Sequence, residues 1–81
     1  MTDIFADIKV KLKSESVFKI KDLPNTYNPL FIFSNEEDEE VFTGFYDEVL
    51  EAFKDNLDLE VKYLDCMQEA WELTLFFKIL N

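Results

Sequence analysis

The chain has 81 residues, with 18 acidic side chains against eight lysines, a net charge of -10, and neither Arg nor His. This length allows a single domain over residues 1–81, and the 48% apolar content, with nine Phe, excludes intrinsic disorder. Direct binding of nucleic acid is not expected, because phosphates are neutralised by Lys and Arg. One cysteine excludes an internal disulfide and indicates a reducing compartment, so we expect a cytoplasmic protein. The apolar runs are too short to span a membrane.

The first third of the chain predicts a helix followed by two strands. Residues 1–12 place apolar side chains on one helical face, although residues 8–13 also alternate as a strand would; we favour the helix. Residues 17–21 alternate apolar residues with lysines and predict a strand. Two prolines and two asparagines make residues 23–29 a loop, with Tyr27 its exposed aromatic. The apolar run 30–33 is typical of a central strand.

Residues 34–55 predict the longest helix. Ser34 and Glu37 have the spacing of a capping box, and the following acids suit the positive end of a helix dipole. At 100° per residue, apolar side chains from Val41 to Phe53 fill one half of the helix, and acids fill the other. Gly44, the single glycine, falls within the acidic half. Such a helix would be about 31 Å long.

The last third predicts two more strands. Residues 57–63 alternate apolar and charged side chains, residues 65–70 are a connector, and residues 71–79 alternate again. A helix over 66–80 is the alternative, because a strand of this length is long. The order helix–strand–strand then occurs twice, which suggests a degenerate internal repeat. We therefore expect an α+β domain of the αββαββ type, with a four-stranded antiparallel sheet and two helices on one face.

The negative charge is concentrated in the middle of the chain. Residues 36–72 contain fourteen acids and two lysines, and the predicted helix has few lysines to relieve its self-repulsion. A solvated helix face is the ordinary explanation of such a pattern. The alternative is a surface for a basic partner, for which the candidate residues are Glu36, Glu37, Glu40, Gly44, Asp47, Glu48, Glu51 and Asp55.

The sequence contains no motif that identifies a reaction. The absence of His and Arg excludes His-based catalysis and bidentate phosphate clamps, and one Gly excludes a glycine-rich phosphate loop. Cys66 has no His or Arg to activate it, so we expect a buried structural thiol. No acidic stretch has the spacing of a calcium loop. We expect no cofactor, no metal site and no enzymatic activity.

In size and charge the chain resembles small phage-encoded inhibitors such as anti-CRISPR proteins, anti-restriction proteins and uracil-DNA glycosylase inhibitors. This resemblance implies a nucleic-acid mimic that occupies the basic groove of a nucleic-acid-binding protein or nuclease, in the host cytoplasm if phage-encoded. An immunity protein or antitoxin against a nuclease is the second hypothesis. The third is a small structural module that forms a homodimer by edge pairing of its final strand.

Overall fold

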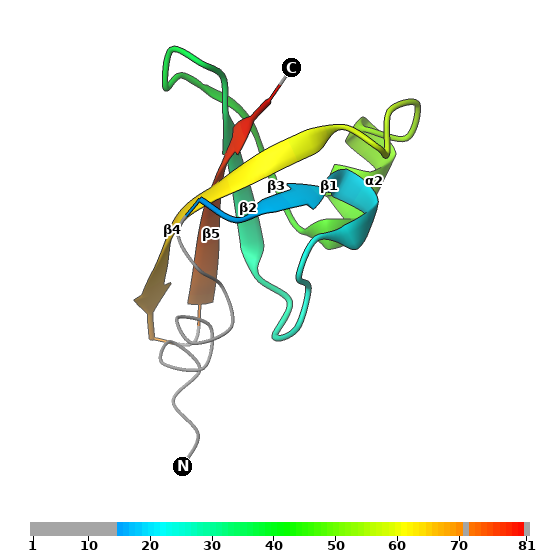
Figure 1. Cartoon of the computed structure of the whole chain (residues 1–81). Coiled ribbons are helices and arrows are strands. Elements are labelled where there is room, and N and C mark those ends of the chain that lie inside the picture. The colour runs from blue at the N-terminus through cyan, green and yellow to red at the C-terminus, as the bar shows by residue number, and fades with distance from the viewer. Residues whose placement is uncertain (1–14, 71, 81) are drawn as a thin grey trace.

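The computed structural model describes residues 15–70 and 72–80. Its elements are β1 (Val17–Lys19), the 3-10 helix η1 (Ile20–Asp22), β2 (Leu30–Ser34), β3 (Glu40–Gly44), α2 (Tyr46–Ala52), β4 (Glu60–Glu69) and β5 (Glu72–Ile79). The five strands form one sheet in the order β1-β4-β5-β2-β3 (Figure 1). β2 and β5 are parallel, and the other neighbouring strands are antiparallel.

The core lies between one face of the sheet and the short helices. β2 and β5 supply Phe31, Phe33 and Phe77, whose ring centroids are 5.8–6.2 Å apart. Val49 from α2 and Ile20 from η1 are fully buried with them. Aromatic pairs at such distances contribute about 0.5–1.5 kcal/mol each beyond the apolar area that they bury. Three of the nine phenylalanines therefore form the centre of the core.

The predicted arrangement of four antiparallel strands under two helices is wrong. The described residues form five strands with one α-helix, so the domain is mostly sheet, and the β2–β5 pair makes that sheet mixed. The helix predicted over residues 1–12, with its strand alternative, lies outside the described residues. The predicted internal repeat is also wrong, because its second half needed a long helix before the strand at 57–63.

That long helix, predicted over residues 34–55, is replaced by a turn, β3 and the seven-residue α2. In the turn, the side-chain oxygen of Asn35 accepts hydrogen bonds from the backbone N–H groups of Glu37 at 2.9 Å and Glu39 at 3.0 Å. This Asx-type turn competes directly with helix formation. Asp38 has φ 63, in the left-handed region, which also ends any helix. Of the residues predicted to be helical, only Tyr46–Ala52 form an α-helix.

The remaining strand predictions are largely confirmed. β2 extends the predicted strand 30–33 by one residue, and β1 covers the first three residues of the predicted strand 17–21. β4 begins three residues later than predicted and continues through the predicted connector to Glu69. β5 confirms a final strand and excludes the alternative helix over 66–80. The β4–β5 ladder runs from Val61↔Ile79 to Glu69↔Glu72.

Candidate functional site

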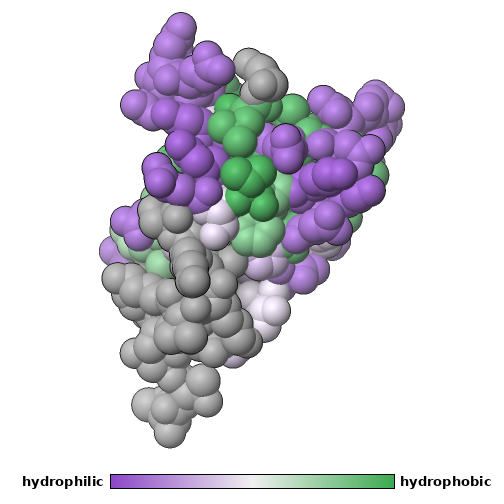
Figure 2. Space-filling view, viewed as in Figure 1, coloured by the Kyte–Doolittle hydropathy of each residue, from purple (hydrophilic) through white to green (hydrophobic). Residues whose placement is uncertain are grey.

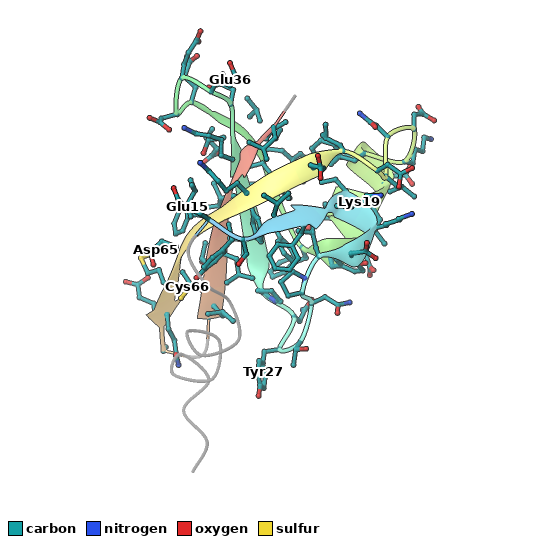
Figure 3. All side chains as sticks on the ribbon, in the orientation of Figure 1. Glu15, Lys19, Tyr27, Glu36, Asp65 and Cys66 are labelled. Carbon is teal, nitrogen blue, oxygen red and sulfur yellow. The ribbon has the colours of Figure 1, made fainter. Side chains whose placement is uncertain are left out.

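All sixteen acidic residues in the described part of the chain are exposed. The predicted partner-binding acids, however, lie in two separate groups. The hairpin patch is the β2–β3 turn and the start of β3, with Glu36, Glu37, Asp38, Glu39 and Glu40; the helix patch is Asp47, Glu48, Glu51 and Asp55 on and just after α2. Figure 1 shows the β2–β3 turn at the upper left and α2 at the right, and Figure 3 labels Glu36 at the tip of this turn.

Figure 2 shows the same separation on the surface. Hydrophilic side chains gather at the upper left and at the right of this view, with a hydrophobic strip between them. The continuous acidic stripe of about 31 Å predicted from the sequence is therefore wrong. A seven-residue helix such as α2 is only about 10 Å long. A partner that used both patches would have to cover the surface between them.

Contacts among the described residues hold the hairpin patch and leave some of its carboxylates without a bonded partner in that part of the chain. Glu39 accepts a hydrogen bond from the side-chain amide of Asn35 at 3.2 Å, and Asp38 pairs with Lys78 of β5 at 3.0 Å. Glu36 and Glu37 have exposed side chains, and their turn is fixed through the Glu37 backbone N–H. The turn thus presents these two carboxylates on a defined backbone.

The helix patch combines one structural acid with more exposed ones. The Glu48 carboxylate accepts a hydrogen bond from the backbone N–H of Phe45 at 3.0 Å and thereby caps the start of α2. Glu51 pairs with Lys54 at 3.4 Å, with both side chains well exposed, so this ion pair adds little stability. Asp47 and Asp55 are exposed. Helix capping therefore explains Glu48, and it does not explain Asp55, which follows the helix.

Gly44 lies at the end of β3, opposite Phe31 of β2, and the prediction that it sits within a helix is wrong. It is buried, and a Cβ atom built on it would lie 3.0 Å from the Glu48 Cβ and 3.0 Å from the Phe42 ring. Contacts of this length are tighter than nine in ten of those that real Cβ atoms make. Intramolecular packing thus accounts for this glycine without an approaching partner.

One cluster of opposite charges was missed in the sequence. Asp58, between α2 and β4, pairs with Lys21 at 2.9 Å and with Lys19 at 3.9 Å. The hydrogen bond and the charge of Lys21, followed by the charge of Lys19, lower the pKa of Asp58, and the same contact with Asp58 raises the pKa of Lys21. Alternation in residues 17–21 and 57–63 showed which side chains share a face; pairing of β1 with β4 brings these charges together.

Cys66 is buried, as expected for a structural thiol. It lies beside Tyr63, whose phenol pKa is raised mainly by burial and also by a hydrogen bond with Cys66. Residues 15–70 and 72–80 contain no group of three or more Cys, Asp or Glu side chains placed to hold a metal ion. Over the same residues, no helix has the length and apolar character needed to cross a bilayer.

Comparison of the chain with protein-family models, with curated proteins and with solved structures finds no match. Any functional assignment therefore depends on the charge, exposure and packing described above.

Proposed function

We propose that this protein is a non-enzymatic, cytoplasmic inhibitor whose acidic surface occupies the basic nucleic-acid-binding groove of a target enzyme. The observation that carries the proposal is the exposure of all sixteen described acids, most of which have no lysine partner within residues 15–70 and 72–80. Anionic surfaces are attracted to the positive potential that such grooves use for phosphates, and this attraction speeds association.

Among the acidic surfaces, the hairpin patch is the one whose charge density is least well explained as an ordinary solvated surface. It places five consecutive acids on one turn, and one of them, Asp38, has a lysine partner within the described residues. Like charges held close together cost stability, which a basic partner would recover. A hairpin tip is also narrow enough to enter a groove. We therefore assign the first contact with the target to the hairpin patch and a supporting role to the helix patch.

An inhibitor fits the side-chain chemistry better than an enzyme does. The chain has no His and no Arg, and Cys66 is buried. An immunity protein or antitoxin would use the same surface in the same way, and differs in its genetic setting and its target. We do not propose a homodimer formed by edge pairing of β5, because β5 lies between β4 and β2 rather than at a sheet edge.

The test begins with affinity capture from the source cell and identification of the captured protein by mass spectrometry. The purified pair is then studied with three folded variants of equal charge change. The hairpin variant carries Glu36→Lys, Glu37→Lys and Glu40→Lys. The helix variant carries Asp47→Lys, Glu51→Lys and Asp55→Lys; it keeps Glu48, which caps α2. The control carries Glu15→Lys, Asp22→Lys and Glu60→Lys, all exposed and outside both patches.

We expect a basic nucleic-acid-binding protein whose affinity falls as salt rises, because screening weakens exposed charge pairs. The hairpin variant should lose most of the affinity, mainly through slower association, and the control should lose little. The protein itself should show no micromolar binding to duplex DNA in a mobility shift. Equal losses in all three variants would mean that net charge alone matters. Undiminished binding by the hairpin and helix variants would refute the acidic interface.

A further inference from the structure

A cavity of about 180 Å³ lies at the end of the sheet away from the hairpin patch. Its lining comes from three segments distant in sequence, and consists of Asn28, Leu30, Phe45, Glu72, Leu73 and Thr74. β2 connects the two ends, since Leu30 lines the cavity and Ser34 leads into the hairpin patch. The loop that precedes β2, marked by Tyr27 in Figure 3, lies at the opposite end of the view from Glu36.

Strand register explains why these side chains meet. Leu30 of β2 pairs with Thr74 of β5, and Phe45 directly follows Gly44, which pairs with Phe31. Alternation then places Phe45, Leu30 and Thr74 in one row across the sheet, on the face opposite to buried Phe31 and Val49. Leu73 alternates with Thr74 and belongs to the core face, so the lining draws on both faces and the cavity lies at the end of the sheet where β2 and β5 begin.

The lining is apolar on its walls and polar at a few points. Leu30, Leu73 and Phe45 provide the apolar part, and Phe45, at 45% exposure, is accessible to a ligand. The polar residues of the lining are Thr74, at 9% exposure, and Asn28, and its acidic residue is Glu72. A cavity of roughly 150 Å³ accommodates benzene, so this one has room for a planar group of similar size.

The charge at this cavity favours a cation. Glu72 stands directly opposite Glu69 in the β4–β5 ladder, and like charges in that position destabilise a sheet. Lysines of the described residues form their ion pairs elsewhere, with Asp38, Glu51 and Asp58. A positive group of a ligand placed beside Glu72 would form an ion pair with this carboxylate. It would also reduce the repulsion between Glu69 and Glu72.

We propose that this cavity binds the guanidinium group of an arginine side chain presented by the basic partner. A guanidinium is flat, weakly hydrated, stacks on aromatic rings and bonds carboxylates through two N–H groups, which matches Phe45 together with Glu72. A lysine ammonium is strongly hydrated and suits the apolar walls less well. A neutral aromatic group would form no ion pair with the Glu72 carboxylate. The identity of the partner rests on the proposed function; the cavity's preference for guanidinium does not.

The test uses the isotopically labelled full chain and small probes, so that no partner protein is needed. N-acetyl-arginine amide is titrated and followed by amide chemical shifts, in parallel with N-acetyl-lysine amide and the neutral N-acetyl-citrulline amide. We expect saturable shifts at residues 28–30, 45 and 72–74 with arginine, at millimolar concentration. Citrulline, which has a similar shape without the charge, should give none there, and lysine should bind more weakly.

Variants then assign the interaction to its groups. Glu72→Gln should weaken arginine binding on the order of fivefold, the size expected for one partly exposed ion pair. Phe45→Leu retains an apolar side chain and the backbone N–H bonded to Glu48 but removes the flat ring; it should weaken binding about two- to fivefold. Glu36→Gln in the hairpin patch is the matched control and should leave the affinity unchanged.

Two results would overturn this assignment. One is shifts that collect on the hairpin patch instead of the cavity. The other is equal binding of arginine and citrulline by the parent protein, a comparison that needs no variant to fold. Either result would refute the guanidinium site and would not bear on the proposed acidic interface, because that interface is tested separately with the hairpin and helix variants. Conversely, saturable arginine binding would stand even if no nucleic-acid-binding protein were captured.

Discussion

Replacing Gly44 with alanine should destabilise the domain, although alanine is the better residue in most ordered segments. The added Cβ would lie 3.0 Å from the Glu48 Cβ and 3.0–3.1 Å from the Cε2 and Cζ atoms of Phe42, whereas carbon atoms prefer about 3.5–4.0 Å. The Glu48 Cβ is attached directly to the backbone of α2, and the Phe42 ring packs against Phe33 and Phe53, which limits how far it can move away. Overpacking of this kind lowers the free energy of unfolding by about 1–3 kcal/mol. Replacing Gly with Ala also reduces the entropy of the unfolded chain, which raises the free energy of unfolding by about 0.4–1 kcal/mol. The difference of these ranges is about 0–2.6 kcal/mol, and we expect a net loss near its middle, of about 1 kcal/mol.

Thermal and urea unfolding followed by circular dichroism would measure this loss. A change of about 1 kcal/mol shifts Tm by roughly 4–8 °C in a domain of this size. The matched control is Thr43→Ala, an exposed position on the same strand, which should change stability by less than about 0.5 kcal/mol. Phe42→Leu removes the two ring atoms concerned, so Gly44→Ala should cost less in that background. If Gly44→Ala equals or exceeds the parent in stability, the close packing of β3 against α2 is not as described.

Three further predictions concern the turn and the titrating groups. Asn35→Ala removes the acceptor of two backbone N–H groups and should cost about 1–2 kcal/mol in urea unfolding. Asp58→Asn should show its full loss of stability relative to the parent above the ordinary carboxyl pKa of 3.8. Because pairing with Lys21 lowers the folded pKa, the difference should decrease below pH 3.8 and vanish as pH falls through that lower value. Burial raises the pKa of Tyr63, so its phenol should stay protonated above pH 10 while the chain is folded, which an ultraviolet pH titration would show. Because the unfolded chain ionises this phenol near pH 10, the free energy of unfolding should fall as pH rises past 10. Tyr63→Phe is the control for this prediction. It has no phenol to ionise at position 63, so the loss of stability above pH 10 should be smaller than in the parent.

Residues 34–55 show why part of the fold could not be predicted. Val41 to Phe53 place apolar residues on one half of a helical wheel, yet Phe42 and Gly44 also alternate with Val41 and Thr43 as in a strand. Local pattern does not distinguish these two periods over so few residues. The structure selects the strand because β2 supplies a pairing partner, with Phe33 opposite Phe42.

The candidate site was predictable in its composition and not in its shape. Exposure of every candidate acid follows from the cost of burying an unpaired charge, which is the same in any fold. The division into hairpin and helix patches follows from the turn at Asn35, whose side chain takes the N–H groups that a helix would have used. The cavity beside Phe45 and Glu72 was not predictable, since it joins three segments far apart in sequence.

The sequence by itself determined the strand at Leu30–Ser34, the final strand at Glu72–Ile79, the buried Cys66 and the outward position of the acids. Each of these depends on a residue's own hydrophobicity or charge and on its immediate neighbours. Tertiary structure alone decided that β5 lies inside the sheet, parallel to β2, and that residues 40–44 extend as β3. Strand order and pairing depend on contacts between distant segments, where the aromatic rings of β2, β5 and β3 pack together, and no local pattern encodes which strands will meet.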